Sequence, residues 1–220
     1  MPIWQQTPAP GRYGALLLLL IVSYLLSAFF SGRWVETLQV VVFTAAALLA
    51  LRSSRVPRRA VRLLLIIAFV AVPVFFALSL STATGDVGTG VANIWTGVVL
   101  LAAVVMIVRR VLGLGTVTMQ SIYGALSAYL IIGLMFAAFF AAIYHLSGDP
   151  FFAPGEPNNT QTFQYFSFTT LTTLGYGDFT AAGNSGRAVA VLEALTGQVF
   201  LATLVARLVA AFRGSGDRQS

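Results

Sequence analysis

Long apolar stretches separated by short polar connections run along most of the chain. Six of them have the length, about 17 to 25 residues, that a helix needs to cross the hydrocarbon core of a bilayer. These stretches are residues 14–30, 35–51, 60–80, 91–108, 122–146 and 188–212. A shorter run at 162–172 is apolar and rich in hydroxyl side chains, which suits a helix that enters the membrane without crossing it. The pattern predicts an all-α membrane protein with six transmembrane helices and one re-entrant helix.

The positions of the basic residues predict the orientation of these helices. All 13 basic residues are arginines, and five of them crowd the connection between the second and third stretches, up to the start of the third, namely Arg52, Arg55, Arg58, Arg59 and Arg62. Only Arg33 and Arg187 fall on the opposite set of connections. The positive-inside rule therefore places both termini in the cytoplasm, with the protein in the cell membrane. Binding of anionic lipid head groups is a second role that the five loop arginines would support.

Composition narrows the classes of function. Hydrophobic residues make up 58% of the chain and charged residues 9%, against about 25% charged residues in soluble domains. The chain has no cysteine and a single histidine, His145, which leaves no thiolate ligands and little acid–base chemistry. We therefore expect no enzyme activity, no cofactor and no nucleic-acid partner.

A glycine-punctuated segment follows the re-entrant run and carries the candidate chemistry. A cation that crosses a membrane must exchange its water shell for other oxygens, and rings of backbone carbonyls supply them. Consecutive carbonyls line a narrow path when ordinary and left-handed backbone angles alternate, which Gly175 and Gly177 allow. Leu174 and Tyr176 are then expected to point away from the axis, and the Thr173 hydroxyl to add a further oxygen ring.

The hexapeptide from Thr173 to Asp178 resembles the selectivity filter of potassium channels, Thr-Val/Ile/Leu-Gly-Tyr/Phe-Gly-Asp. It lies between two spanning stretches and follows Thr172 and the aromatic pair Tyr165-Phe166. The resemblance implies potassium conduction by a four-fold symmetric homotetramer. It also implies a hydrogen bond from Tyr165 to Asp178, with Thr169 standing where some relatives carry a glutamate. The residues implied to bind K⁺ are Thr173, Leu174, Gly175, Tyr176 and Gly177.

The resemblance covers residues 122 to about 213, and the four stretches before it match the six-helix channel plan in number and topology only. We therefore expect two regions. Residues 1–118 correspond to a four-helix, voltage-sensor-like region, and residues 119–213 to a pore domain, followed by a short cytoplasmic tail at 214–220. The pore domain is expected to consist of an outer helix at 122–146, the pore helix at 162–172, the filter at 173–178 and an inner helix at 187–212. The fourth stretch, residues 91–108, contains no arginine, so steep voltage gating is not expected.

Three features of the inner helix leave more than one interpretation open. Gly197 is a gating hinge or a close-packing contact. At the spacing of a helix, Gln198, Ala202 and Val205 share a face and are candidates for lining an inner cavity. Glu193 is an acidic residue well inside a spanning stretch, and it serves either as a brace for the filter or as a proton sensor.

The sequence thus predicts a potassium-selective channel without a calcium- or nucleotide-binding module on this chain. A weakly selective cation channel is the nearest alternative. The ion-translocating subunit of a potassium transporter and a non-conducting regulatory subunit are two others.

Overall fold

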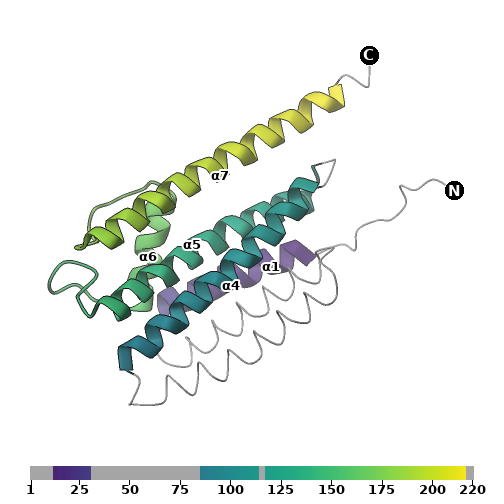
Figure 1. The fold of residues 1–220 in the computed structure, drawn as a ribbon. Helices are drawn as coiled ribbons and strands as arrows, with labels where there is room; N and C mark the ends of the chain where they lie inside the picture. Colours follow the sequence, from purple (N-terminus) through teal and green to yellow (C-terminus); the bar gives the residue numbers. More distant parts are fainter. Residues whose placement is uncertain (1–11, 31–84, 114–116, 217–220) are drawn as a thin grey trace.

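The computed structural model describes residues 12–30, 85–113 and 117–216, and every regular element in these residues is an α-helix. The helices are α1 (Arg12–Phe29), α4 (Gly85–Gly113), α5 (Met119–Ser147), α6 (Thr160–Leu171) and α7 (Asn184–Gly216). Figure 1 shows α4, α5 and α7 as long rods, with the short α6 at one end between α5 and α7. The stretches expected at 35–51 and 60–80, and the five arginines between them, lie outside the described residues.

Helices α4, α5 and α7 begin before and end after the corresponding apolar stretches, whereas α1 and α6 each end one residue earlier than expected, at Phe29 and Leu171. Three of the described helices are long and apolar enough to cross a membrane: Asp86–Gly113, Met119–Ser147 and Asn184–Ala210. The apolar part of α1, Tyr13–Phe29, is shorter. Helix α7 continues to Gly216, so residues 214–216 of the expected tail are helical.

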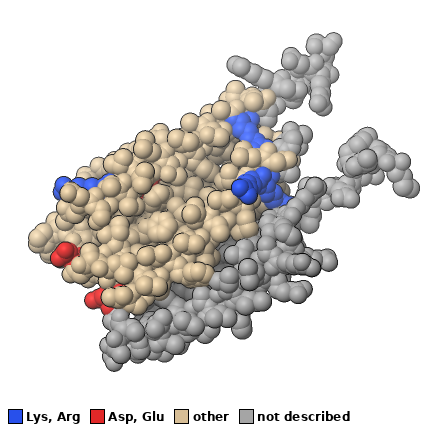
Figure 2. All heavy atoms as spheres, in the orientation of Figure 1, with Lys and Arg blue, Asp and Glu red and all other residues tan. Residues whose placement is uncertain are grey.

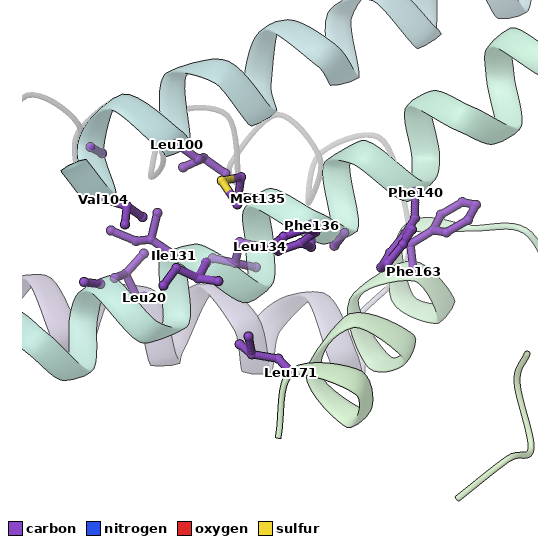
Figure 3. Close-up of a cluster of buried hydrophobic side chains, with 14 of the residues drawn as sticks. Leu20, Leu100, Val104, Ile131, Leu134, Met135, Phe136, Phe140, Phe163 and Leu171 are labelled. Atoms are coloured by element: carbon purple, nitrogen blue, oxygen red, sulfur yellow. The ribbon is translucent and has the colours of Figure 1, made fainter. Parts of the chain in front are cut away.

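Helix α5 forms the centre of the hydrophobic core (Figure 3). Its residues Ile131 and Phe140 are completely buried. Leu20 of α1, Leu100 of α4 and Leu171 of α6 reach the same core from three other helices. Because α5 is covered on several sides, its sequence is apolar almost all round, as expected for a buried helix.

Helices α4 and α5 pack closely and run antiparallel. Glycines allow this approach: a Cβ on Gly97 would overlap the ring of Phe139, and a Cβ on Gly124 would lie 3.1 Å from Val111. These contacts join early α4 to late α5 and late α4 to early α5, so the two helices touch along most of their length. Small residues are the usual means by which membrane helices come close.

Charged side chains mark the two ends of the helix bundle. Asp86, in the first turn of α4, lies 3.2 Å from His145, in the last turn of α5. Arg109 and Arg110 lie near the opposite end of α4. Figure 2 shows basic side chains gathered where α4 and α7 end, whereas the other end of the molecule carries acidic side chains together with a smaller basic patch.

Helix α1 contacts the short helix α6 directly. The Ser27 hydroxyl donates a buried hydrogen bond of 2.9 Å to the side-chain oxygen of Gln164. Tyr24 and Phe168 pack edge to face, with ring centroids 4.9 Å apart. The first helix is therefore attached to the element that precedes the candidate filter.

An aromatic cluster holds the loop between α5 and α6, a stretch that the sequence presents as turn-rich. Phe151 and Phe152 of this loop are buried against Phe140 of α5 and Phe163 of α6. The Asn158 side-chain oxygen accepts hydrogen bonds from the backbone N–H groups of Phe151 and Phe152, at 3.0 and 3.3 Å. The start of α6 is fixed by these contacts.

Candidate functional site

Helix α6 places the candidate filter, and both of its ends have identifiable caps. Asn159 accepts hydrogen bonds from the backbone N–H and the hydroxyl of Thr162, both at 2.9 Å, so α6 begins two residues before the predicted position. At the other end, the Thr172 backbone N–H donates to the Phe168 carbonyl at 3.1 Å, and the chain leaves the helix there. The C-terminal carbonyls of α6 therefore lie beside the segment that follows.

Those carbonyls accept hydrogen bonds from the first backbone N–H groups of the candidate filter. Thr173 donates to the Thr170 carbonyl at 3.0 Å, and Leu174 and Gly175 donate to the Thr169 carbonyl at 2.8 and 3.2 Å. Thr169 thus supports the segment through its backbone, while its hydroxyl donates back to Phe166. The Thr172 hydroxyl likewise donates to the Phe168 carbonyl at 2.7 Å.

Left-handed backbone angles recur at every second residue of the segment. Thr173 has φ 58°, Gly175 φ 53° and Gly177 φ 80°. Glycine adopts such angles at little cost, whereas a β-branched threonine there is strained. The two glycines were expected from the sequence, and Thr173 was not. The alternation turns successive carbonyls in the way that a carbonyl-lined path requires.

The carbonyl groups of residues 173–177 are not used inside the chain. Among the described residues, none of these five oxygens accepts a hydrogen bond. Two large side chains within the segment are also exposed to solvent on a single chain: Leu174 is 54% exposed and Tyr176 is 69% exposed. The segment thus presents polar oxygens and large apolar side chains that the described part of one chain leaves exposed.

Asp178 and Tyr165 form the hydrogen bond that the resemblance implied. The Tyr165 hydroxyl donates to Asp178 Oδ2 at 2.7 Å, and Asp178 Oδ1 accepts from the Phe179 backbone N–H at 3.1 Å. The hydrogen bond to the carboxylate, together with desolvation, raises the pKa of Tyr165 to about 12. The phenol therefore keeps the proton that it donates, and the outer end of the segment stays attached to α6.

The inner helix contributes two polar side chains near the segment. Gln198 Nε2 lies 3.3 Å from the Thr173 hydroxyl. Glu193 is fully buried, and its Oε1 lies 2.5 Å from the Ser167 hydroxyl of α6. Ala202 and Val205 lie further along α7 and are exposed on a single chain, as Gln198 is. The sequence left Glu193 as either a brace or a proton sensor, and in the structure its hydrogen-bond partner is Ser167.

Gly197 is where α7 passes closest to α6. A Cβ at this position would overlap the backbone carbonyl oxygen of Leu171 and come 2.9 Å from the Leu171 side chain. The same carbonyl accepts a hydrogen bond of 3.2 Å from the Tyr129 hydroxyl of α5. Close packing is thus an observed property of Gly197, and helices α5, α6 and α7 meet at the end of α6.

Several of these residues carry no signal in the sequence that would single them out. Asn159 is an exception, because an Asn directly before a helical run is a typical N-cap and could have predicted where α6 begins. Tyr129, Ser167 and Gln164 are ordinary polar residues in apolar helices, and only the packing shows what they contact. In the described part of the chain there is no cluster of His, Cys, Asp and Glu side chains suited to a metal ion.

The comparison with known protein families agrees with the location of this site. Residues 134–214 match a family model described as an ion channel. The matched region begins within α5 and includes α6, the candidate filter and nearly all of α7. No curated protein and no solved structure matches the chain. The region that holds the site is therefore similar to ion channels, which supports a transport role and not an enzymatic one.

The sign of a stability change distinguishes the two interpretations of Gly197. Alanine at an unconstrained glycine in a helix stabilises it by about 1 kcal/mol. Because a Cβ on Gly197 would overlap the Leu171 carbonyl, we expect Gly197→Ala to lower the free energy of unfolding, by roughly 1–3 kcal/mol as in other overpacked sites. Thermal unfolding of the purified protein measures this effect.

Gly113→Ala is the matched control, since nothing lies within 4 Å of a Cβ at Gly113, at the end of α4. It should leave stability unchanged or slightly raised. Stabilisation by Gly197→Ala would contradict the close-packing interpretation.

Proposed function

We propose that the chain is one subunit of a channel that conducts potassium ions passively across a membrane through a ring of backbone carbonyls from residues 173–177. One observation carries the proposal: these carbonyls have no hydrogen-bond partner among the described residues, while the first three N–H groups of the segment are bound to the end of α6. A dehydrating cation needs oxygen ligands of this kind. The similarity of residues 134–214 to ion channels supports this assignment.

The electrostatics of the site favour a cation. Helix α6 ends at Leu171, one residue before the segment, and the aligned peptide dipoles of a helix give its C-terminal end about half a negative charge. Gln198 and the Thr173 hydroxyl add neutral polar groups at the same end of the segment. These groups offset part of the cost of removing water from the ion, and no ionised side chain is needed in the path.

Several copies of the chain are needed to close a ring, because each chain contributes one segment. Leu174 and Tyr176 are exposed on a single chain, and contact with a neighbouring subunit would bury them. Helix α7 also exposes a series of large apolar side chains, which are Val191, Leu192, Leu195, Val199, Val205 and Val209. We infer a homotetramer with cyclic symmetry, in which α7 and the segment of each chain pack against those of its neighbours.

The channel is proposed not to sense voltage. Helix α4 has no charged residue between Asp86 and Arg109, so its central part carries no gating charge. Its glycine-mediated contact with α5 also opposes sliding of α4 along α5. Helices α1 and α4 then act as a fixed scaffold beside the pore. The basic residues grouped where α4 and α7 end support a cytoplasmic location for both termini.

Selective potassium permeation is the first test. The purified chain, reconstituted in liposomes under a potassium/sodium gradient, should give a reversal potential close to the potassium equilibrium potential, because a carbonyl ring replaces the hydration shell of K⁺. A reversal potential near zero would indicate a weakly selective cation channel. Slow, saturating flux would indicate a transporter subunit, and no flux a regulatory protein.

Two glycine variants distinguish a specific defect in the candidate filter from a general defect in folding in this assay. Gly177→Asp should abolish selectivity or conduction, since Gly177 has φ 80° within the segment. Gly155→Asp is the matched control, because Gly155 has φ 95° in the outer loop with open space around it. Equal effects of the two substitutions would mean that the loss is not specific to the filter.

Subunit number is the second test. Native mass spectrometry of the purified channel should give four times the 23.4 kDa of one chain. Co-expression of tagged and untagged chains should give one more mass species than there are subunits, which counts the subunits independently. A monomer or dimer that still conducts potassium would contradict the proposed assembly.

Voltage dependence is the third test. Each gating charge that crosses the membrane field contributes about 2.3 kcal/mol per 100 mV, and the central part of α4 has none. The conductance in planar bilayers should therefore vary little with voltage between strongly negative and strongly positive potentials. A steep conductance–voltage curve, equivalent to several charges per subunit, would refute the scaffold role of α4.

A further inference from the structure

A hydrogen-bonded contact joins three helices behind the candidate filter. Ser167 of α6 is completely buried between α5 and α7. Its hydroxyl oxygen lies 2.6 Å from the backbone carbonyl oxygen of Gly133 in α5 and 2.5 Å from Oε1 of Glu193 in α7. Both distances are within the range of O–H···O hydrogen bonds. One serine hydroxyl therefore has two close oxygen partners.

The number of protons at this contact decides which groups donate. A serine hydroxyl has one proton to donate, and a backbone carbonyl only accepts. If Glu193 were ionised, its oxygens would also only accept, and one of the two short O···O contacts would contain no proton. If Glu193 is protonated, its O–H donates to Ser167 and the Ser167 O–H donates to Gly133. Only the protonated form places a proton in both contacts.

The surroundings of Glu193 also disfavour an ionised carboxylate. The side chain is 0% exposed, and its second oxygen, Oε2, is buried without a hydrogen-bond partner among the described residues. Helices α5 and α6 contain no Asp, Glu, Lys or Arg, and the histidine of α5, His145, lies in the last turn beside Asp86, three turns beyond Gly133. The two helices packed on Glu193 therefore place no counter-ion beside it. The nearest basic residues of α7 in sequence are Arg187 and Arg207, both more than one helical turn away. Burying a charge without a partner costs much more free energy than burying a neutral C=O oxygen without a hydrogen-bond partner.

We propose that Glu193 is a neutral carboxylic acid that donates its proton to Ser167, which in turn donates to the Gly133 carbonyl, and that this relay positions α6 between α5 and α7. Glu193 is then a positioning residue for the filter and adds no negative charge to the ion path. Gly133 also allows the approach of α6, since a Cβ there would lie 2.6 Å from the Phe168 ring. The inference rests on the three-helix contact and does not depend on which ion passes.

Infrared spectroscopy of the reconstituted protein tests the proton directly. At neutral pH the spectrum should contain the carbonyl stretching band of a protonated carboxylic acid, which is absent from carboxylates. The band should disappear in Glu193→Gln, which keeps a side-chain N–H to donate to Ser167. Ser167→Ala should keep the band but shift it, because the carboxylic acid loses its hydrogen-bond acceptor. A brace that acted through packing alone would give no such shift.

Two controls test whether the infrared band belongs to Glu193. Glu156→Gln removes an exposed loop carboxylate and should leave the protonated band unchanged. Glutamate labelled with ¹³C should shift the band in the unsubstituted protein, so the result does not depend on a variant that folds. Loss of a carboxylate band in Glu193→Gln, with no protonated band in the parent protein, would overturn the proposal. Because no readout here measures ion flux, its failure is distinct from failure of the proposed channel function.

Discussion

The need to satisfy backbone polar groups within a membrane is the constraint on which this structure depends. A helix satisfies its backbone N–H and C=O groups with internal hydrogen bonds, whereas irregular backbone exposed to lipid leaves them without partners. Residues 173–177, just after the end of α6, are the exception among the described residues, because their carbonyls accept no hydrogen bond there. The surrounding elements hold this segment in place. Its first N–H groups are bound to α6, its outer end to Tyr165 through Asp178, and its inner end lies beside Gln198.

The end of α6 is correspondingly well fixed. Tyr129 of α5 donates to the Leu171 carbonyl, and the backbone of α7 approaches the same carbonyl at Gly197. One turn earlier in α6, Ser167 connects Gly133 of α5 with Glu193 of α7. These contacts use neutral groups or very short side chains, because uncompensated charges are expensive in this environment. The position of the candidate filter is thus fixed by contacts among three helices, α5, α6 and α7, and not by the segment alone.

Much of the architecture could be predicted from the sequence because hydrophobicity and length are local properties. The helices expected at 91–108, 122–146 and 188–212 correspond to α4, α5 and α7, and the re-entrant run corresponds to α6. Glycine spacing likewise predicted left-handed angles at Gly175 and Gly177. The boundaries were less accurate, since a cap such as Asn159 and polar ends that stay helical are weak signals in an apolar sequence.

The sequence by itself determined that this is an α-helical membrane protein and where its oxygen-rich segment lies, because an apolar span and a glycine-alternating motif are each encoded by neighbouring residues. Only the tertiary structure decided that Gly197 packs on Leu171, that Asp86 pairs with His145, and that Ser167 faces both Gly133 and Glu193. These contacts join residues far apart in the chain. Their identity depends on how helices rotate and approach one another, which a single amphipathic pattern does not specify when nearly every face is apolar.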